Sequence, residues 1–157
     1  MEQLILYLDP WSGVSGDMLL AALLDLDRES RHLEAALRGA VGALGLDEAL
    51  IEVAHEVERG IACTRVRVKE EGAAPLRHLA DMERMIGGAA ALSDGVREGA
   101  LQAVRRLAEV EAAVHGCAVE EIHFHEVGAV DTLVDIVGTF TLVEALGVQQ
   151  VMVGVIP

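Results

Sequence analysis

The chain has 157 residues, of which 52% are hydrophobic and 24% are charged, and its formal net charge is −14. This composition is typical of one globular domain, which at this length buries roughly 70% of its unfolded surface. The excess of carboxylates argues against binding to nucleic acids or anionic membranes, because both attract proteins through Lys and Arg. The mean hydropathy of +0.38 indicates further apolar burial, either between copies in a homo-oligomer or against another domain.

The two cysteines, Cys63 and Cys117, form no CxxC pair, so their spacing signals neither a zinc site nor redox chemistry. Two lone thiols suit a reducing compartment. The start of the chain, MEQLILYLDP, has no basic region before its apolar run. No run reaches the roughly 18 apolar residues of a membrane-spanning helix. A cytoplasmic protein is therefore expected.

The first part of the chain predicts a strand followed by two helices. Residues 3–8 (QLILYL) are a short apolar run typical of a buried strand, and the turn-rich stretch DPWSGVSGD follows. A helix is expected from Met18, with Ser15 as its N-cap. A second helix is predicted over residues 30–43 and is expected to stop at Gly45.

The middle of the chain predicts a β-hairpin. Residues 50–58 and 61–69 both alternate apolar with polar or small side chains, which is the period of a half-buried strand. Arg59 and Gly60 stand between them and suit a turn.

Three further helices are expected in the second half, over residues 77–87, 94–115 and 131–146. The residues expected to cap or stop the last two are Ser93, Gly116, Asp131 and Gly147. A final strand is expected in VQQVMVGVIP. The order of elements predicts an α/β or α+β fold, in which a small mixed β-sheet packs with several α-helices in one domain over residues 1–157. Because the chain stops just after an apolar strand, an N-terminal fragment of a longer protein is expected, with the C-terminal domain of that protein as a partner.

The stretch HFHEVGAVD holds the densest group of potential metal ligands. His123 and His125 share one face if the segment is extended, and two imidazoles at that spacing can bind one divalent ion. Glu126 joins them only if the chain turns at Gly128, and Asp131 could complete the set or merely cap the helix that follows. Packing of one histidine in the core, with the other in solvent, is the alternative.

Asp135 raises a separate question, because it stands inside the apolar run LVDIVG. A charge in such a run costs free energy unless it is paired or bound to a cation. It lies four residues after Asp131, so the two side chains share a helix face.

The loop DPWSGVSGDM follows a strand and precedes a helix, which is the arrangement of many anion sites. Backbone N–H groups near four residues are expected to hold phosphate, namely Ser12, Gly13, Ser15 and Gly16. Asp9 and Asp17 could hold a metal that the phosphate also contacts. The loop lacks the Gly-Lys-Ser/Thr of a Walker A motif, and a purely structural turn is the alternative.

The pair of motifs DPWSGVSGDM and HFHEVGAVDTLVDIVG resembles the nickel insertion proteins, the LarC-type nickel chelatases. RGIACTRVRV and AEVEAAVHG are similar to segments of the same family. The resemblance implies insertion of nickel into a pyridinium bisthiocarboxylate mononucleotide, a lyase-type reaction that consumes CTP and supplies the cofactor of lactate racemase. It also implies nickel and a nucleotide-like substrate. Ligand chemistry agrees, since imidazoles suit borderline Ni²⁺ and carboxylates suit Mg²⁺ or Mn²⁺. The CTP-binding part of the family is associated with a C-terminal region, so the fragment alone is expected to lack activity.

The resemblance carries metal binding to His123, His125, Glu126, Asp131, Asp9 and Asp17, and phosphate binding to Ser12, Gly13, Ser15 and Gly16. This chain departs from the family in lacking a histidine run before Arg77, where only His78 remains. That difference weakens a nickel-relay role for this segment.

Two other functions remain open. An assembly module without its own metal site would explain the high apolar content, and a metal-dependent hydrolase is a third possibility, although no base other than Glu126 is evident. If the two motifs form one site, Asp9 or Asp17 should lie close to His123, His125 or Glu126, and Asp135 should point to the same cluster or pair with a basic residue.

Overall fold

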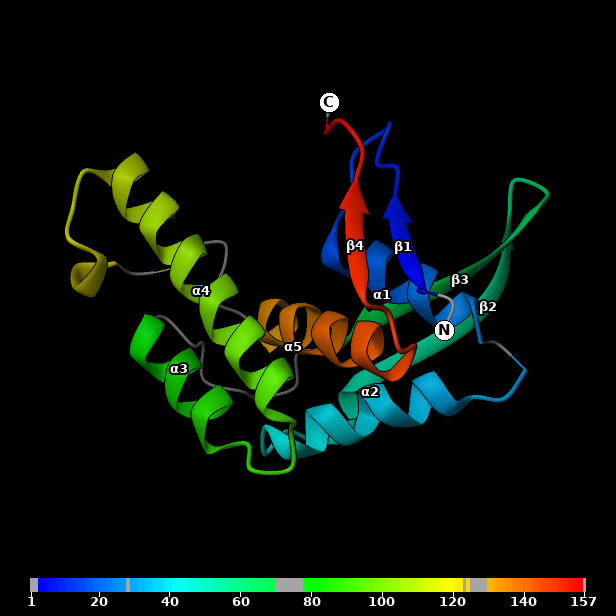
Figure 1. Ribbon diagram of the computed structural model, residues 1–157, viewed down its shortest axis with the longest axis horizontal. Coiled ribbons are helices and arrows are strands. Elements are labelled where there is room, and N and C mark those ends of the chain that lie inside the picture. Colours follow the sequence, from blue (N-terminus) through cyan, green and yellow to red (C-terminus); the bar gives the residue numbers. More distant parts are fainter. Residues whose placement is uncertain (1–2, 28, 70–77, 123, 125–129, 157) are drawn as a thin grey trace.

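A computed structural model describes residues 3–27, 29–69, 78–122, 124 and 130–156. The helices are α1 (Gly16–Asp25), α2 (His32–Ala43), α3 (Leu79–Gly88), α4 (Asp94–His115) and α5 (Val130–Ala145). The strands are β1 (Ile5–Leu8), β2 (Ile51–Glu58), β3 (Ile61–Val68) and β4 (Gln150–Val153). Two single 3₁₀ turns, η1 (Glu48–Leu50) and η2 (Val119–Glu121), complete the described elements. The mixed class of helices and small sheets is therefore confirmed (Figure 1).

The strands form one parallel and one antiparallel pair. β1 and β4 come from opposite ends of the chain and run parallel, with Ile5 opposite Gln150 and Leu8 opposite Val153. β2 and β3 form the predicted antiparallel hairpin. Its two turn residues, Arg59 and Gly60, have φ values of 50° and 85°. Two positive φ values in a two-residue turn match the twist of the flanking strands, which is why the hairpin closes there.

The predicted helix ends are mostly confirmed. Ser93 accepts a hydrogen bond from the backbone N–H of Val96 at 3.1 Å, and Gly116 ends α4 in the left-handed conformation. Ser15 occupies the N-cap position of α1, although its side chain makes no capping bond. The prediction that Asp131 caps α5 is wrong, because the helix begins at Val130 and places Asp131 inside its first turn.

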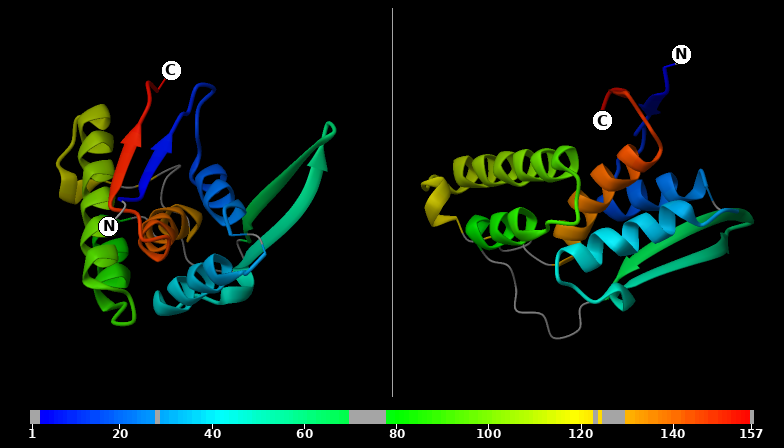
Figure 2. Two further views of the ribbon diagram at one scale, coloured as in Figure 1. Left: turned by 45° about the vertical axis from the view of Figure 1, so that its right-hand side comes forward. Right: turned by 60° about the horizontal axis from the view of Figure 1, so that its bottom comes forward.

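Helix α5 is the centre of the molecule. It lies between α1 and α2 on one side and α4 on the other, as the two views of Figure 2 show. One core cluster, with α3 and α4, takes Leu133 and Val137 from α5. The other, with α1, α2 and the hairpin, takes Val130, Val134 and Leu142. A helix that is apolar around most of its circumference is expected at such a buried position. Among the described residues, no helix is both long and apolar enough to cross a membrane.

Small residues let the neighbouring helices approach α5 closely. A Cβ atom at Gly138 would lie 2.6 Å from Leu37 Cδ1 of α2 and 3.0 Å from Leu20 Cδ2 of α1. A Cβ at Gly99 of α4 would lie 2.5 Å from Phe140 Cε1 of α5. Protein cores have no spare volume for an added methyl group, so these glycines set the distances between the helices.

Replacing Gly138 by Val should therefore lower the free energy of unfolding by about 2 kcal/mol, because the side chain overpacks a filled core. Urea denaturation followed by circular dichroism measures the change. Gly39→Val is the matched control, since Gly39 is exposed on α2 and a Cβ there meets no atom within 4 Å. The control should change stability by less than about 0.5 kcal/mol. Equal losses in both variants would contradict the close-packing account.

Candidate functional site

The loop between β1 and α1 is held by its own backbone. Trp11 N–H donates to the Asp9 carbonyl at 2.9 Å, and Gly13 N–H donates to the Pro10 carbonyl at 3.0 Å. Gly13 has a φ of 88°, a conformation that glycine adopts without strain. The loop is thus a pair of tight turns that carries the chain from the end of β1 to the first residue of α1.

Asp9 lies at the strand end of this loop, beside β4. A Cβ at Gly154 would lie 3.1 Å from Asp9 Oδ1, and Gly154 N–H donates to the Leu8 carbonyl at 2.7 Å. Asp9 therefore stands where the carboxyl ends of β1 and β4 meet. This is the edge of a parallel sheet at which α/β proteins commonly place ligands.

The other end of the loop packs directly against α5. Gly16, the first residue of α1, touches the side chain of Asp135 so closely that an added Cβ would lie within 2.5 Å of Asp135 Cβ and overlap its carboxyl group. Only glycine fits between this loop and α5. The predicted phosphate-binding residue Gly16 thus meets the aspartate that stands inside the apolar run of the second motif.

Three carboxylates gather around this contact, and we call Asp17, Asp131 and Asp135 the acidic cluster. Burial, followed by the charges of Asp131 and Asp17, raises the pKa of Asp135 to about 6. Asp135 Oδ1 is buried and has no hydrogen-bond partner among the described residues. A carboxylate in this position is destabilised by lost hydration and by two like charges, so a proton or a cation is needed to relieve it.

The two outer members of the acidic cluster stand at helix starts. Asp17 lies in the first turn of α1 and Asp131 in the first turn of α5. Ser15 Oγ donates a hydrogen bond to Asp17 Oδ1, and Thr132 N–H donates to Asp131 Oδ1 at 2.6 Å. The positive ends of two helix dipoles partly offset the charges of these two aspartates, whereas Asp135 lies a full turn further along α5.

The central metal-ligand predictions cannot be placed. His123, His125, Glu126 and Gly128 lie outside the described residues, as does Arg77. In the part of the chain that the structure describes, no three His, Cys, Asp or Glu side chains are arranged to hold a metal ion. The acidic cluster by itself is therefore an incomplete coordination site.

A hollow of about 270 Å³ adjoins the acidic cluster, between the first turns of α1 and the strand β3. Asp17 and Met18 line one wall, and residues 63–66 line the other. This second wall belongs to RGIACTRVRV, the segment with the weaker family resemblance. Arg65 in it pairs with Glu56 at 3.2 Å and with Glu58 at 2.9 Å. The hollow is thus bordered by the carboxylate of Asp17 and by Arg65, whose positive charge is balanced by two glutamates.

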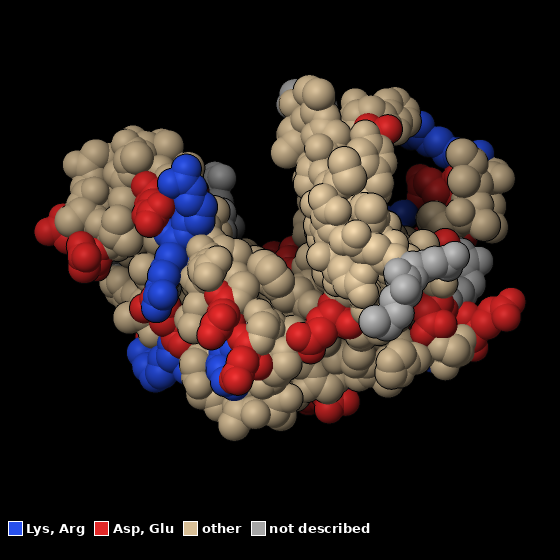
Figure 3. Space-filling model, in the orientation of Figure 1, with Lys and Arg blue, Asp and Glu red and all other residues tan. Residues whose placement is uncertain are grey.

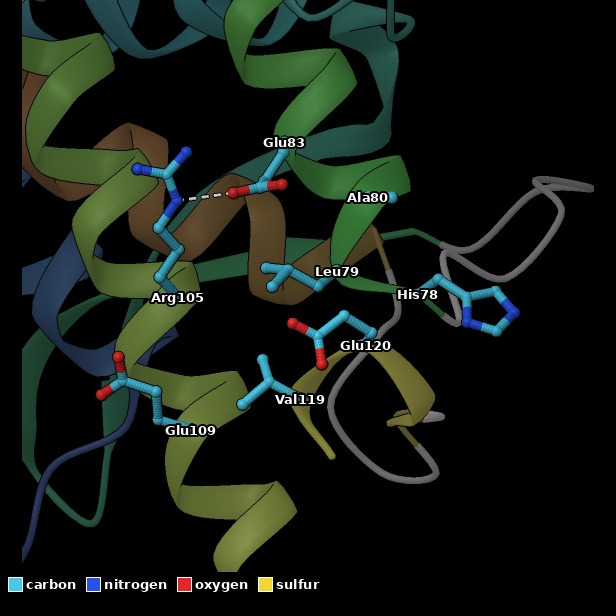
Figure 4. A pocket seen from close by; sticks show the side chains of 8 residues that line it. All are labelled: His78, Leu79, Ala80, Glu83, Arg105, Glu109, Val119 and Glu120. Atoms are coloured by element: carbon cyan, nitrogen blue, oxygen red, sulfur yellow. Dashed lines mark hydrogen bonds and ion pairs between the residues drawn. The ribbon is translucent and has the colours of Figure 1, made fainter. Parts of the chain in front are cut away.

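A second hollow, of about 570 Å³, lies between α3, α4 and η2, away from the residues that the sequence singled out. Its lining residues are His78, Leu79, Ala80, Glu83, Arg105, Glu109, Val119 and Glu120. Figure 4 shows Glu83 and Arg105 joined across one side, with Nε–Oε1 at 2.5 Å, while the His78 ring points away from the other side chains. Because its polar groups do not converge on one point, this larger hollow is a weaker candidate than the acidic cluster.

Sequence reasoning missed the reason for Gly16. It predicted that Gly16 exposes its N–H to an anion, whereas the structure shows a steric need for glycine against Asp135. The signal was available in part, since Asp135 was identified as a charge within an apolar run. Nothing in the sequence joined that residue to a glycine far earlier in the chain.

The chain is similar in sequence to known nickel insertion proteins. The model of a family described as "Nickel insertion protein" matches residues 6–157. A "Putative nickel insertion protein" of Thermomicrobium roseum is 45% identical over 98% of this chain, and one of Geobacter sulfurreducens is 42% identical over 98%. A "Pyridinium-3,5-bisthiocarboxylic acid mononucleotide nickel insertion protein" of Desulfitobacterium hafniense is 42% identical over 92%.

These matches cover only part of the relatives, namely 37%, 39% and 35% of their respective lengths. No solved structure shows a significant match. The family match nevertheless spans both motifs and nearly every described element. The chain belongs to the nickel insertion protein family.

Proposed function

We propose that this chain is the nickel-handling domain of a chelatase that inserts nickel into pyridinium-3,5-bisthiocarboxylic acid mononucleotide. The name of the Desulfitobacterium hafniense relative supports this substrate. The observation that carries the proposal is the half-buried Asp135 side chain, whose buried Oδ1 has no hydrogen-bond partner among the described residues and which packs against Gly16 beside Asp17 and Asp131. A cation is the natural counterpart of such a cluster.

The site that we propose combines the acidic cluster with the imidazoles of His123 and His125 and the carboxylate of Glu126. The acidic cluster and the HFHEVGAVD stretch share Asp131, which is the last residue of that stretch. Imidazole nitrogen suits borderline Ni²⁺, while carboxylate oxygen suits Mg²⁺ or Mn²⁺. Oxygen donors hold nickel loosely compared with sulfur, so the thiocarboxylate groups of the substrate would draw the ion away. Nickel would therefore move from the harder ligands of the protein to the softer sulfur ligands of the substrate.

The phosphate of the substrate needs a cation at this site. Backbone N–H groups of Ser15 and Gly16 at the start of α1 favour an anion, but Asp17 and its neighbours repel one. A divalent ion between the carboxylates and the phosphate would remove the repulsion and let the phosphate reach the backbone N–H groups. Consumption of CTP and the use of Mg²⁺ or Mn²⁺ fit this arrangement, and both belong to the proposal, as do the cytoplasmic location, a homo-oligomeric state and a C-terminal domain as partner.

An assembly module is the second candidate, because several large apolar side chains on β1 and β4 are exposed. Such a module needs neither the histidine pair nor the acidic cluster. Metal titration separates the two functions.

Nickel binding should depend on the histidine pair. Isothermal titration of the chain with Ni²⁺ should show binding that weakens as the pH falls through about 6.5, because ligation requires neutral imidazole. A His123→Ala/His125→Ala variant should bind at least about 10-fold more weakly. His32→Ala, an exposed histidine at the start of α2, is the control and should bind normally. Unchanged Ni²⁺ affinity in the double variant would contradict a nickel site at His123 and His125.

Phosphate binding should depend on a divalent ion and on Asp17. Nicotinic acid mononucleotide, a stable pyridinium mononucleotide, should bind in the presence of Mn²⁺ and not in EDTA. Asp17→Asn should weaken that binding about 10-fold, which corresponds to one charge-assisted contact. Asp94→Asn, in the first turn of α4, is the matched control and should have no effect. Equal binding in EDTA and in Mn²⁺ would show that the loop binds anions directly.

The raised pKa of Asp135 should appear in the pH dependence of stability without metal. The folded state holds the proton up to about pH 6, whereas the unfolded chain releases it near 3.8. The free energy of unfolding should therefore fall as the pH rises from 4 to 6 through this group. At pH 7 in EDTA, Asp135→Asn should be more stable than the original chain by about 1–2 kcal/mol, a value reduced for partial solvent screening.

The same comparison at pH 3.5 should show little difference, since Asp135 is then protonated in the folded state and mostly protonated in the unfolded chain. Glu98→Gln, an exposed change on α4, should leave stability within about 0.5 kcal/mol of the original at both pH values. A destabilised Asp135→Asn protein at pH 7 would mean that the charged carboxylate has a partner that compensates its burial.

A further inference from the structure

The parallel pair β1 and β4, which we call the β1–β4 ribbon, leaves an unusual amount of apolar surface exposed. Five of its large side chains are between 46% and 59% exposed, namely Ile5, Tyr7, Val151, Met152 and Val153, and Leu4 just before β1 is 49% exposed. All four residues of β4 are exposed. In Figure 1 the carboxyl ends of the two strands extend beyond the helices, while Leu6 of β1 still packs against the core.

Such a ribbon is not a stable structure by itself. Parallel strands are normally buried on both faces, and two strands alone are marginal in water. Within the described chain, β4 pairs with β1 only, so its other edge offers a row of unsatisfied peptide groups. Both the exposed side chains and the open edge call for a further strand.

The charge distribution limits what can cover the ribbon. Residues 3–8 and 149–156 contain no charged side chain, although the whole chain carries a net charge of −14. Figure 3 shows the ribbon as a column without Lys or Arg, separated from α4 by a notch. An apolar, uncharged segment fits this surface. At this surface a second copy is disfavoured, because it would bring another net charge of −14 close to the first, so the proposed homo-oligomer would have to use another face.

We propose that the open edge of β4 is completed by an uncharged β-strand from the part of the family polypeptide that lies outside this chain. The relatives support this choice, since the match covers only 37% of the Thermomicrobium roseum protein. A strand in the same polypeptide is present at a high effective concentration and avoids most of the entropy cost of association.

The added strand also bears on the site. β1 ends at Leu8, just before Asp9, and β4 ends at Val153, just before Gly154, which lies against Asp9. A third parallel strand beside β4 would bring its carboxyl end to the same edge. The polypeptide outside this chain thereby contributes residues next to the loop that begins at Asp9. This inference concerns architecture and stands independently of nickel binding.

Hydrogen–deuterium exchange tests the proposal in two matched forms. The first is this chain, and the second is a longer polypeptide in which this chain replaces the matched portion of the Thermomicrobium roseum protein. Amides of residues 150–153 should exchange about 100-fold more slowly in the longer polypeptide. The natural Thermomicrobium roseum protein, whole and cut to its matched portion, provides the same comparison if the chimaera does not fold. Equal exchange rates in the two forms would overturn the proposal.

A charged residue introduced into β4 provides a second test of the added strand. Met152→Glu should leave the Tm of this chain unchanged but lower that of the longer polypeptide by roughly 10 °C, because the carboxylate is then buried. Val114→Glu, at an exposed apolar position on α4, should change neither. An unchanged Tm for Met152→Glu in the longer polypeptide would contradict the added strand. So would sedimentation of this chain alone as a dimer with slowly exchanging β4 amides, since a second copy would then cover the edge.

Discussion

The close packing of α5 against its neighbours is the constraint on which the rest of the structure depends. Glycines at the contacts set the spacing, with Gly138 against Leu37 and Leu20, and Gly16 against Asp135. Because aromatic residues make up only 3% of the chain, the core is built mainly from aliphatic Leu, Val and Ala side chains. The same packing that forms the core brings the start of α1 onto α5.

That contact has an electrostatic consequence. It partly buries the Asp135 carboxyl group near two other aspartates in the first turns of helices, and the pKa of Asp135 rises to about 6 as a result. The fold thus holds an unfavourable charge in place instead of excluding it. Retention of such a cost is common at functional sites, where strain in the free protein is relieved by the ligand. Under the proposed function, a domain that receives a divalent cation and then releases it to softer donors benefits from a site that is not satisfied without the ion.

Local patterns in the sequence predicted nearly all of the secondary structure. Alternation in residues 50–58 and 61–69 predicted the hairpin, and Ser93 and Gly116 predicted the limits of α4, because these signals depend on neighbouring residues only. The prediction that Asp131 caps α5 was wrong, because an aspartate is equally favourable at the N-cap and in the first turn of a helix. The pairing of β1 with β4 and the contact of Gly16 with Asp135 join distant parts of the chain, which periodicity does not report. Asp135 was recognised as out of place in an apolar run, but its partner was not. The histidine pair lies outside the described residues and stays a prediction.

A nickel anomalous difference map from crystals of the chain grown with Ni²⁺ tests the central claim most directly. Our account predicts one peak at the acidic cluster, within bonding distance of carboxylate oxygen from Asp17, Asp131 or Asp135 and of imidazole nitrogen from His123 or His125. A peak elsewhere on the molecule would contradict it. So would a cluster in which Asp135 is paired with a basic side chain and no nickel is bound.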